Sequence, residues 1–263
     1  MPELMSLVRS TDVPTGAVGI WWIGQAGYIF KTSSGKVIFI DAYLSGALDG
    51  PPEAWPRRYP PPIQPEEVEC DLFIATHNHS DHNDLEAIRR MDWDRIGAFL
   101  GPRNVIRALR GIGVPEGKLV LCDAGDTAVA AGLKLLATFC IPNDAEALDS
   151  AGYLITTEDG LRLYHTGDTG FHRFLYYMAA HPIDVMFVCI NGKLGNMGGD
   201  EAAELARYLR PKLVVPNHYD MFARNMADQW EFLGRLNATG VEPPAKVLEV
   251  GETFVYRMDV AKA

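Results

Sequence analysis

Three of the seven histidines in this sequence lie within six residues of one another, together with an aspartate. Residues 77–82 read HNHSDH and follow the apolar run Leu72–Thr76, which predicts a short buried strand. Alternate residues of an extended segment face the same side, so we expect His77 and His79 to point together, before the chain turns and presents Asp81 and His82. A polar loop that merely caps a helix is the alternative. Four such groups desolvated together need a cation, and imidazole and carboxylate suit Zn²⁺, Fe²⁺ or Mn²⁺.

Two more candidate ligands follow apolar strands, which is where αβ folds place active residues. Asp168 lies in the sequence YHTGDTG at 164–170, whose glycines allow a tight turn that aims the carboxylate outward. His218 lies in PNHYD at 216–220, directly after the predicted strand Leu213–Pro216. Taken alone, the segment around Asp168 reads equally well as an ordinary glycine-rich turn, and a histidine just after a buried strand is more often a surface residue than a ligand. The histidine cluster upstream favours a shared metal site.

Composition limits the other classes of function. The 263 residues suffice for one αβ domain or two fused halves, and the net charge of −10 repels nucleic acid and anionic lipid. The basic doublets Arg57-Arg58 and Arg89-Arg90 read as solvated surface. Residues 1–15 are mostly polar, and no stretch approaches the ~20 apolar residues of a membrane span. We therefore expect no nucleic acid or membrane partner, and a homo-oligomer is compatible with the sequence.

The four cysteines are widely spaced and form no CxxC pair. This spacing predicts free thiols in a reducing cytoplasm.

Short apolar runs separated by turn residues predict many strands. Besides those already named, they are Val18–Ile23, Tyr28–Lys31, Val37–Ile40, Ala98–Gly101, Leu119–Cys122, Leu133–Cys140, Tyr153–Thr157, Arg162–His165, Val185–Ile190, Val247–Val250 and Thr253–Tyr256. Helices are expected at Asn83–Met91, Arg103–Arg110, His172–Ala180, Ala202–Leu209 with Asp200 as N-cap, and 226–236. Seven prolines in residues 46–66 predict a long surface loop. The pattern indicates two β-sheets packed face to face with helices outside.

Several of these segments, in this order, resemble the metallo-β-lactamase superfamily, and within it the L-ascorbate-6-phosphate lactonase group and the neighbouring small metal-dependent hydrolase proteins. They are GIWWIGQAG at 19–27, the histidine cluster, YHTGDTG, PNHYDM at 216–221, and Asn191-Gly192-Lys193 before Asn196-Met197-Gly198. The resemblance spans roughly residues 17–255. It implies an α+β fold, the four-layer αβ/βα sandwich, as a single domain of residues 1–263 with two pseudo-symmetric halves and the site at the shared edge of its sheets. It also implies that His77 and His79 bind a first metal, that Asp81, His82 and His218 bind a second, and that Asp168 bridges the two.

The sequence departs from the superfamily at one point. Many members supply a third histidine to the first metal between the cluster and the bridging aspartate, whereas residues 137–144 here read ATFCIPND. Asp144, Asn143 or Cys140 could substitute, and His165 and His172 are further candidates. If none does, the first site is weak.

A divalent cation lowers the pKa of bound water from 15.7 to about 7 and so supplies hydroxide at neutral pH. Asp81 could orient this nucleophile and shuttle its proton, while Lys193 and Asn191 are the candidate contacts for an anionic substrate. The preferred hypothesis is a hydrolase with one or two Zn²⁺ or Mn²⁺ ions that opens a lactone or ester of a small anionic metabolite, such as a phosphorylated sugar acid. A phosphodiesterase is the alternative, and a redox or structural metal protein is a third.

Overall fold

The computed structural model describes residues 3–50, 54–142, 147–239 and 243–258, whose strands form two sheets. The first has the order β13-β1-β2-β3-β4-β5-β6 and the second the order β12-β11-β10-β9-β8-β7. The first sheet comprises β1 (Ala17–Gly24), β2 (Gly27–Thr32), β3 (Val37–Ile40), β4 (Leu72–Ile74), β5 (Phe99–Gly101), β6 (Leu119–Leu121) and β13 (Phe254–Arg257). The second comprises β7 (Thr127–Ala130), β8 (Leu133–Phe139), β9 (Ala151–Thr156), β10 (Arg162–His165), β11 (Val185–Cys189) and β12 (Leu213–Asn217).

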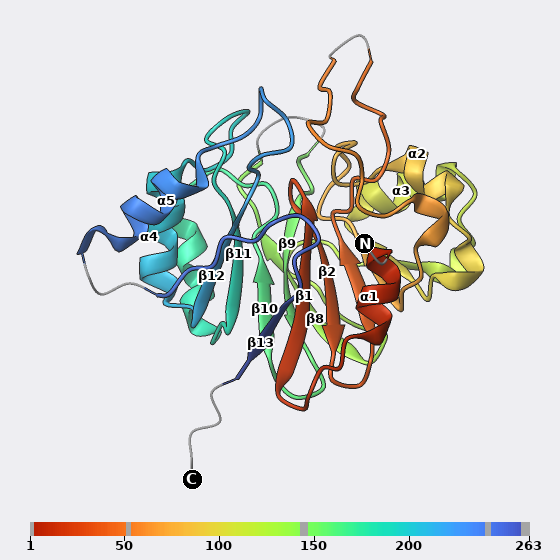
Figure 1. The fold of residues 1–263 in the computed structure, drawn as a ribbon, viewed down its shortest axis with the longest axis horizontal. Coiled ribbons are helices and arrows are strands. Elements are labelled where there is room, and N and C mark those ends of the chain that lie inside the picture. Colours follow the sequence, from red (N-terminus) through yellow and green to blue (C-terminus); the bar gives the residue numbers. More distant parts are fainter. Residues whose placement is uncertain (1–2, 51–53, 143–146, 240–242, 259–263) are drawn as a thin grey trace.

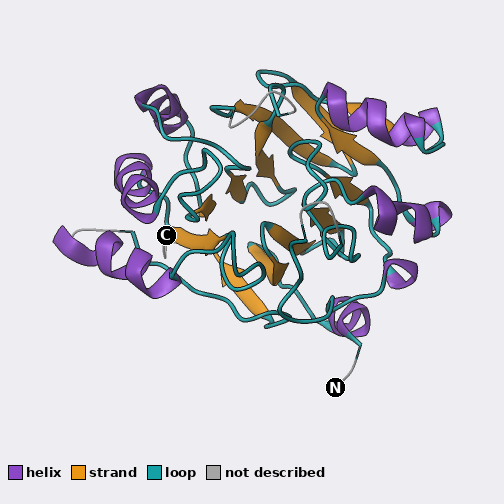
Figure 2. Cartoon of the chain, turned by 90° about the horizontal axis from the view of Figure 1, so that it is seen from above, coloured by secondary structure: helices purple, strands orange, loops and turns teal. Residues whose placement is uncertain are grey.

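Helices cover the outer faces of the two sheets (Figures 1 and 2). On the first sheet lie α1 (Leu4–Ser10), α2 (Leu85–Arg90) and α3 (Arg103–Gly111); on the second lie α4 (Gly199–Leu209) and α5 (Gln229–Leu236). Short 3-10 helices are η1 (Pro65–Glu67), η2 (Trp93–Arg95), η3 (Glu116–Lys118), η4 (Arg173–Ala180) and η5 (Asn237–Thr239). The four-layer sandwich is thereby confirmed. No helix in the described part of the chain could cross a membrane.

The layering explains why β1 is apolar along its whole length. Trp22 packs in the core between the two sheets, whereas Trp21 packs in the core beneath α1 to α3. All eight residues of β1 are buried because both faces of the strand are covered. A strand enclosed on both sides reads as a continuous apolar run rather than an alternating one.

Parallel pairing brings the chemistry-bearing segments to the ends of neighbouring strands. β3 to β6 run parallel in the first sheet, as do β10 to β12 in the second. Asp41 follows β3, the histidine cluster follows β4, and Asp168 and His218 follow β10 and β12. Because the carboxyl ends of parallel strands share an edge, residues far apart in sequence meet there.

Besides the three-residue 3-10 helices, two described elements escaped the sequence prediction. One is α1, whose buried face of Leu4, Met5 and Val8 has helical spacing within a mostly polar segment. The other is β7, which pairs antiparallel with β8 through a two-residue turn at Ala131-Gly132. Its residues are mostly exposed or only partly buried, so its sequence does not form the continuous apolar run that marks a buried strand.

Three predicted elements are corrected by the structure. Val247–Val250 is not a strand, because the chain pairs beside β12 earlier, at Ala245, and only Val250 makes a bridge, to Trp22. The helix predicted over 226–236 begins only at Gln229, where Asp228 caps it. Asp200 is not an N-cap but lies in the first turn of α4, after Gly198. The segment after His172 is helical as predicted, but of the 3-10 type.

Residues 55–59 of the proline-rich segment contact the far half of the chain. An isolated bridge joins Arg57 to Phe222, and the Arg58 backbone N–H donates to the Met221 carbonyl at 3.0 Å. Tyr43, Met221 and Phe222 form a small apolar cluster against which Trp55 and Tyr59 pack. Residues 55–59 therefore lie over the chain that follows His218.

Asp84 ties the start of α2 to the chain after β3. Its buried carboxylate accepts hydrogen bonds from the Ala87 N–H, the Leu44 and Ser45 N–H groups and the Ser45 hydroxyl, all at 2.8–3.0 Å. It thus caps α2 and fixes the loop beside the histidine cluster at the same time.

We predict that Asp84→Ala destabilises the protein by about 3 kcal/mol, because it removes a helix cap and leaves buried N–H groups without an acceptor. Urea unfolding measures the loss. Asp92→Ala is the matched control, since Asp92 is an exposed cap of η2 and its removal should cost about 1 kcal/mol or less. Equal losses in the two variants would contradict the structural role of Asp84.

Candidate metal centre

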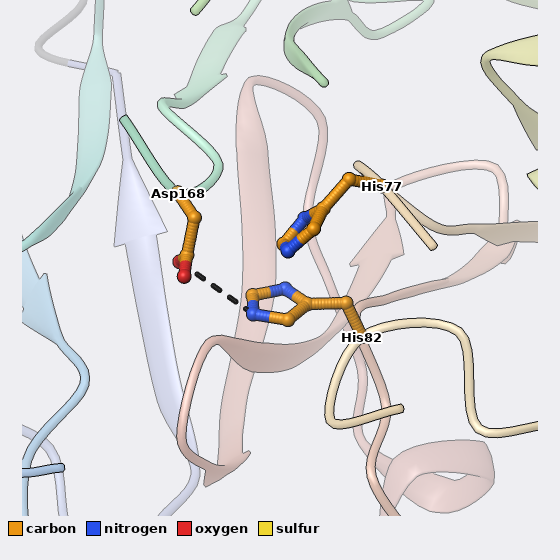
Figure 3. Close-up of side chains that lie close together, drawn as sticks. All are labelled: His77, His82 and Asp168. Atoms are coloured by element: carbon orange, nitrogen blue, oxygen red, sulfur yellow. Dashed lines mark ion pairs between the residues drawn. The ribbon is translucent and has the colours of Figure 1, made fainter. Parts of the chain in front are cut away.

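Two sets of candidate ligands meet at the shared edge of the sheets. One comprises His77, His82 and Asp168, whose ligand atoms all lie within 4.8 Å of one another; the second comprises Asp81, His82 and His218 on the same criterion. Figure 3 shows the rings of His77 and His82 on one side and the Asp168 carboxylate facing them from the other. His82 belongs to both sets and therefore lies between them.

Three buried atoms converge without hydrogen-bond partners. His218 Nε2 lies 2.7 Å from Asp168 Oδ1, and His82 Nε2 lies 3.5 Å from the same oxygen. Although these distances are short, none of the three atoms makes a hydrogen bond of acceptable geometry within the described residues. Buried polar groups seldom lack partners, so this arrangement fits a cation held between them. The donor set of imidazole and carboxylate suits a divalent transition metal or zinc.

The charges of the site favour the same conclusion. Burial alone would raise the pKa of the Asp168 carboxyl, but the neighbouring His218 and His82 rings hold that pKa well below its usual value. For His82, burial opposes protonation, yet Asp168, Asp41 and Asp81 raise its pKa well above the usual value. Burial lowers the pKa of His77 to about 3, so its ring stays neutral. Positive charge therefore stabilises the carboxylates. Either protons on the imidazole rings or a bound cation can supply this charge, so the two compete for the site.

Asp41 is a functional candidate that the sequence analysis missed. Its buried Oδ2 lies 2.8 Å from His82 Nδ1 and also accepts from the Thr76 hydroxyl, while Oδ1 accepts from the Thr76 N–H at 2.7 Å. An acceptor on Nδ1 fixes the ring and leaves Nε2 for a metal. Asp41 directly follows β3, so the criterion that selected Asp168, a carboxylate at the end of a buried strand, could have found it.

Backbone turns aim Asp168 and His218 into the site. Gly167 adopts a φ of 63°, a left-handed conformation that suits glycine, and the chain bends at Asp168. His218 also adopts a φ of 63°, a conformation that is rare for residues other than glycine. Its N–H donates to the Gln25 carbonyl at 3.0 Å, and its own carbonyl accepts from Ala227. Asn196 Nδ2 donates to Asp168 Oδ2 at 2.7 Å and holds the carboxylate from behind.

His79 lies beside the first set of ligands. Its Nδ1 is 2.8 Å from His77 Nε2, with the two rings edge to face. The predicted pairing of these two histidines is therefore found in space, while their roles as ligands stay a prediction. Asp81 Oδ2 lies 3.6 Å from His82 Nε2, on the side of the second set.

The candidates for a third first-site ligand fare differently. Asn143 and Asp144 lie outside the described residues. Cys140 Sγ donates to the Thr166 carbonyl at 3.2 Å, and burial raises the pKa of its thiol, which opposes its use as a thiolate ligand. All four cysteines are free thiols, as predicted.

His165 and His172, the two further candidates for this ligand, make other contacts. Both ring nitrogens of His165 are engaged, Nε2 with the Ala26 carbonyl and Nδ1 with the Gly167 N–H, so this ring supports the turn before Asp168. His172 caps η4 by accepting from the Phe174 N–H. Their direct ligation was an alternative that the geometry does not favour.

Lys193 and Asn191 lie in the loop after β11. The exposed Lys193 Nζ donates to the Met226 carbonyl at 3.2 Å, and the buried Asn191 Nδ2 donates to Asn225 Oδ1 at 2.7 Å. Both side chains therefore connect this loop to the segment after His218. Their contact with a substrate stays a prediction.

Comparison with known proteins decides the family. The family model described as the beta-lactamase superfamily domain matches residues 19–218. This range includes every ligand candidate that the structure brings together. The chain belongs to this superfamily. It is 30% identical to a UPF0173 metal-dependent hydrolase of Thermococcus kodakarensis over 89% of this chain and 98% of that protein. A UPF0173 metal-dependent hydrolase of Cupriavidus taiwanensis is 31% identical over 87% and 85%.

Among solved structures, a metallo hydrolase of the archaeon Ignicoccus hospitalis is similar, with a TM-score of 0.73, 25% identity and coverage of 92% of this chain and 99% of that one. The chain is thus a member of the UPF0173 metal-dependent hydrolases. The finer resemblance to the ascorbate-6-phosphate lactonase group is not among these findings.

We predict that Asp41→Asn lowers metal affinity roughly 10- to 100-fold, the usual effect of losing a hydrogen-bond partner of a ligand. The Asp41 carboxylate accepts from Thr76 and contacts His82 through two oxygens, whereas an amide has only one acceptor oxygen. Asn also tolerates the φ of 49° at this position. Competition with a chromophoric chelator measures the affinity. Asp220→Asn is the matched control, because Asp220 has a φ of 61° but an exposed side chain paired with Arg58.

We further predict that chelator-treated protein binds metal in two steps, because the first set lacks a third histidine and leaves more coordination positions to water. Mn²⁺ should tolerate this better than Zn²⁺. Asp144→Ala should weaken the looser step if Asp144 is the substitute ligand, and Cys140→Ala should do so if the thiol is. Two equally tight steps unaffected by either change would refute the idea of a weak first site.

Proposed function

We propose that this hydrolase opens a lactone or ester of a small anionic metabolite with the help of one or two divalent cations. The convergence of His82 Nε2, Asp168 Oδ1 and His218 Nε2 on one buried point carries the proposal. We assign His77, His79 and Asp168 to one cation and Asp81, His82 and His218, with Asp168 shared, to the other. A cation held there supplies Lewis acidity and, at neutral pH, hydroxide.

The chain's own residues have separable roles in this reaction. His82 belongs to both ligand sets, and Asp168 Oδ1 of one set lies 2.7 Å from His218 Nε2 of the other, so both residues suit the role of joining the sets. Asp81 lies at the edge of the second set and is less buried than His82, which suits it to orient the attacking water and accept its proton. Asp41 holds His82 from the side away from the site.

An anionic substrate is supported by the position of Lys193. Its ammonium group has three donors, and one contact with the Met226 carbonyl is found in the described part of the chain. Because the side chain is exposed in the loop beside the site, it can meet a carboxylate or phosphate at the entrance. Asn191 is assigned to the same end of the substrate.

We predict that Asp168→Asn abolishes hydrolysis and lowers bound metal by more than the 10- to 100-fold typical of an indirect contact, since the neutral amide offsets cation repulsion poorly. Purified protein reloaded with Zn²⁺ or Mn²⁺ is assayed on panels of lactones and phosphodiesters, and its metal content is measured. Asp126→Asn, at an exposed turn, is the matched control.

Turnover of lactones, lost on chelation and restored by metal, is the expected outcome. Turnover of phosphodiesters alone would replace the substrate class but keep the metal site. Full activity and unchanged metal content in Asp168→Asn would place this residue in an ordinary turn and overturn the proposal.

A further inference from the structure

Gln25 is a buried side chain that the catalytic assignment leaves without a role. It lies in the turn between β1 and β2, is fully buried, and adopts a φ of 51°. A glutamine gains nothing from this left-handed backbone, where glycine or asparagine is preferred. A buried carboxamide must also have hydrogen-bond partners to offset its desolvation. Both costs point to a specific use of this side chain.

The Gln25 side chain contacts two of the candidate ligands at once. Its Nε2 lies 3.1 Å from Asp81 Oδ2 and 3.1 Å from His218 Nδ1. The backbone reinforces the contact, because the Gln25 carbonyl accepts from the His218 N–H and from Trp22 Nε1. A residue of the first sheet is thereby fastened to a ligand at the end of the second.

The contact is selective for one of the two ligand sets. Asp81 and His218 belong to the set that shares His82, whereas the set of His77, His82 and Asp168 makes no hydrogen bond to Gln25 among the described residues. Gln25 is also the one described side chain that forms a hydrogen bond with His218 Nδ1. The orientation of the His218 ring therefore depends on it.

The amide can serve His218 in either state of the ring. With Nε2 toward Nδ1, the amide donates; Oε1 then has no partner in the described part of the chain. A histidine that binds a cation through Nε2 carries its proton on Nδ1 and needs an acceptor there. Rotation of the carboxamide by half a turn offers Oε1 for this purpose, since the two ends of the group are nearly equal in shape. The rotation also takes the donor Nε2 away from Asp81, so with a cation bound the amide accepts from His218 and no longer donates to Asp81.

We propose that Gln25 is the positioning residue of the cation set formed by Asp81, His82 and His218. Its carboxamide joins Asp81 to the His218 ring when no cation is bound and orients the His218 ring when one is, and so controls the affinity of that set for a divalent cation without touching the cation. The inference rests on the proposed function, because it presupposes that these residues bind metal. It identifies a residue in the turn between β1 and β2 that sets the cation affinity of one ligand set and not of the other.

The test is a metal titration of three variants, followed by competition with a chromophoric chelator and by the visible spectrum of bound Co²⁺. Gln25→Leu removes both hydrogen bonds at nearly constant volume, and Gln25→Glu keeps an acceptor for His218 but loses the donor to Asp81. Gln64→Leu, at an exposed position, is the matched control. Titrations of Asp81→Ala and His77→Ala identify which binding step belongs to which set.

Gln25→Leu should weaken the step that Asp81→Ala removes roughly 10- to 100-fold and alter the Co²⁺ spectrum, while the other step keeps its affinity. Gln25→Glu should bind more tightly at that step than Gln25→Leu. The thermal midpoint of the chelator-treated protein should be similar in Gln25→Leu and Gln64→Leu.

Wild-type affinity at both steps in Gln25→Leu would overturn the inference. So would equal weakening of both steps with a much lower thermal midpoint, since that pattern indicates a structural role only. If the wild-type chain binds no divalent cation, the proposed function itself fails, and the two failures are therefore distinguishable.

Discussion

Carboxylates and imidazoles are crowded into a buried space where the two sheets share an edge, and the charge balance of this space governs the structure around it. Asp41, Asp81 and Asp168 all raise the pKa of His82, whose ring lies at the centre of the group. Desolvated carboxylates are tolerated only near positive charge or donors. The strands that end here, the turns with left-handed residues and the loop after β11 all serve to bring these groups together.

The cost of this assembly is visible in the backbone. Asp41, Gln25 and His218 all have positive φ values, although none is glycine. Conformations of this kind persist where surrounding structure over-determines them and often mark functional sites. Here the surrounding structure is explicit: Asp41 N–H donates to the Ile74 carbonyl, and His218 N–H donates to that of Gln25. Strained residues are thus locked by hydrogen bonds to a neighbouring strand or turn.

The sequence predicted the fold and the ligand candidates to the extent that their signals are local. The histidine cluster is a short motif, and strands such as β11 are uninterrupted apolar runs, so both are legible from a few residues. Asp41 could have been selected as a carboxylate at the end of a buried strand, but its contact with His82, forty-one residues away, is not visible in a local pattern. Val247–Val250 was misread for a similar reason: its apolar residues suit a strand, but the edge of β12 is already paired with the chain at Ala245. A local sequence pattern cannot show which backbone N–H and C=O groups at the edge of a sheet are still free to pair with another strand.

The site draws its groups from both sheets, with His77, Asp81 and His82 following the first and Asp168 and His218 following the second. A cation bound among them would therefore connect the two halves of the chain. Unfolding or separation of the halves would destroy its binding site, so a cation would bind the folded form alone and stabilise it by mass action. At a free concentration of one hundred times the Kd, this linkage amounts to about 2.7 kcal/mol. For a protein of this size that is a substantial share of the total stability, so metal supply would govern the abundance of the folded enzyme as well as its turnover.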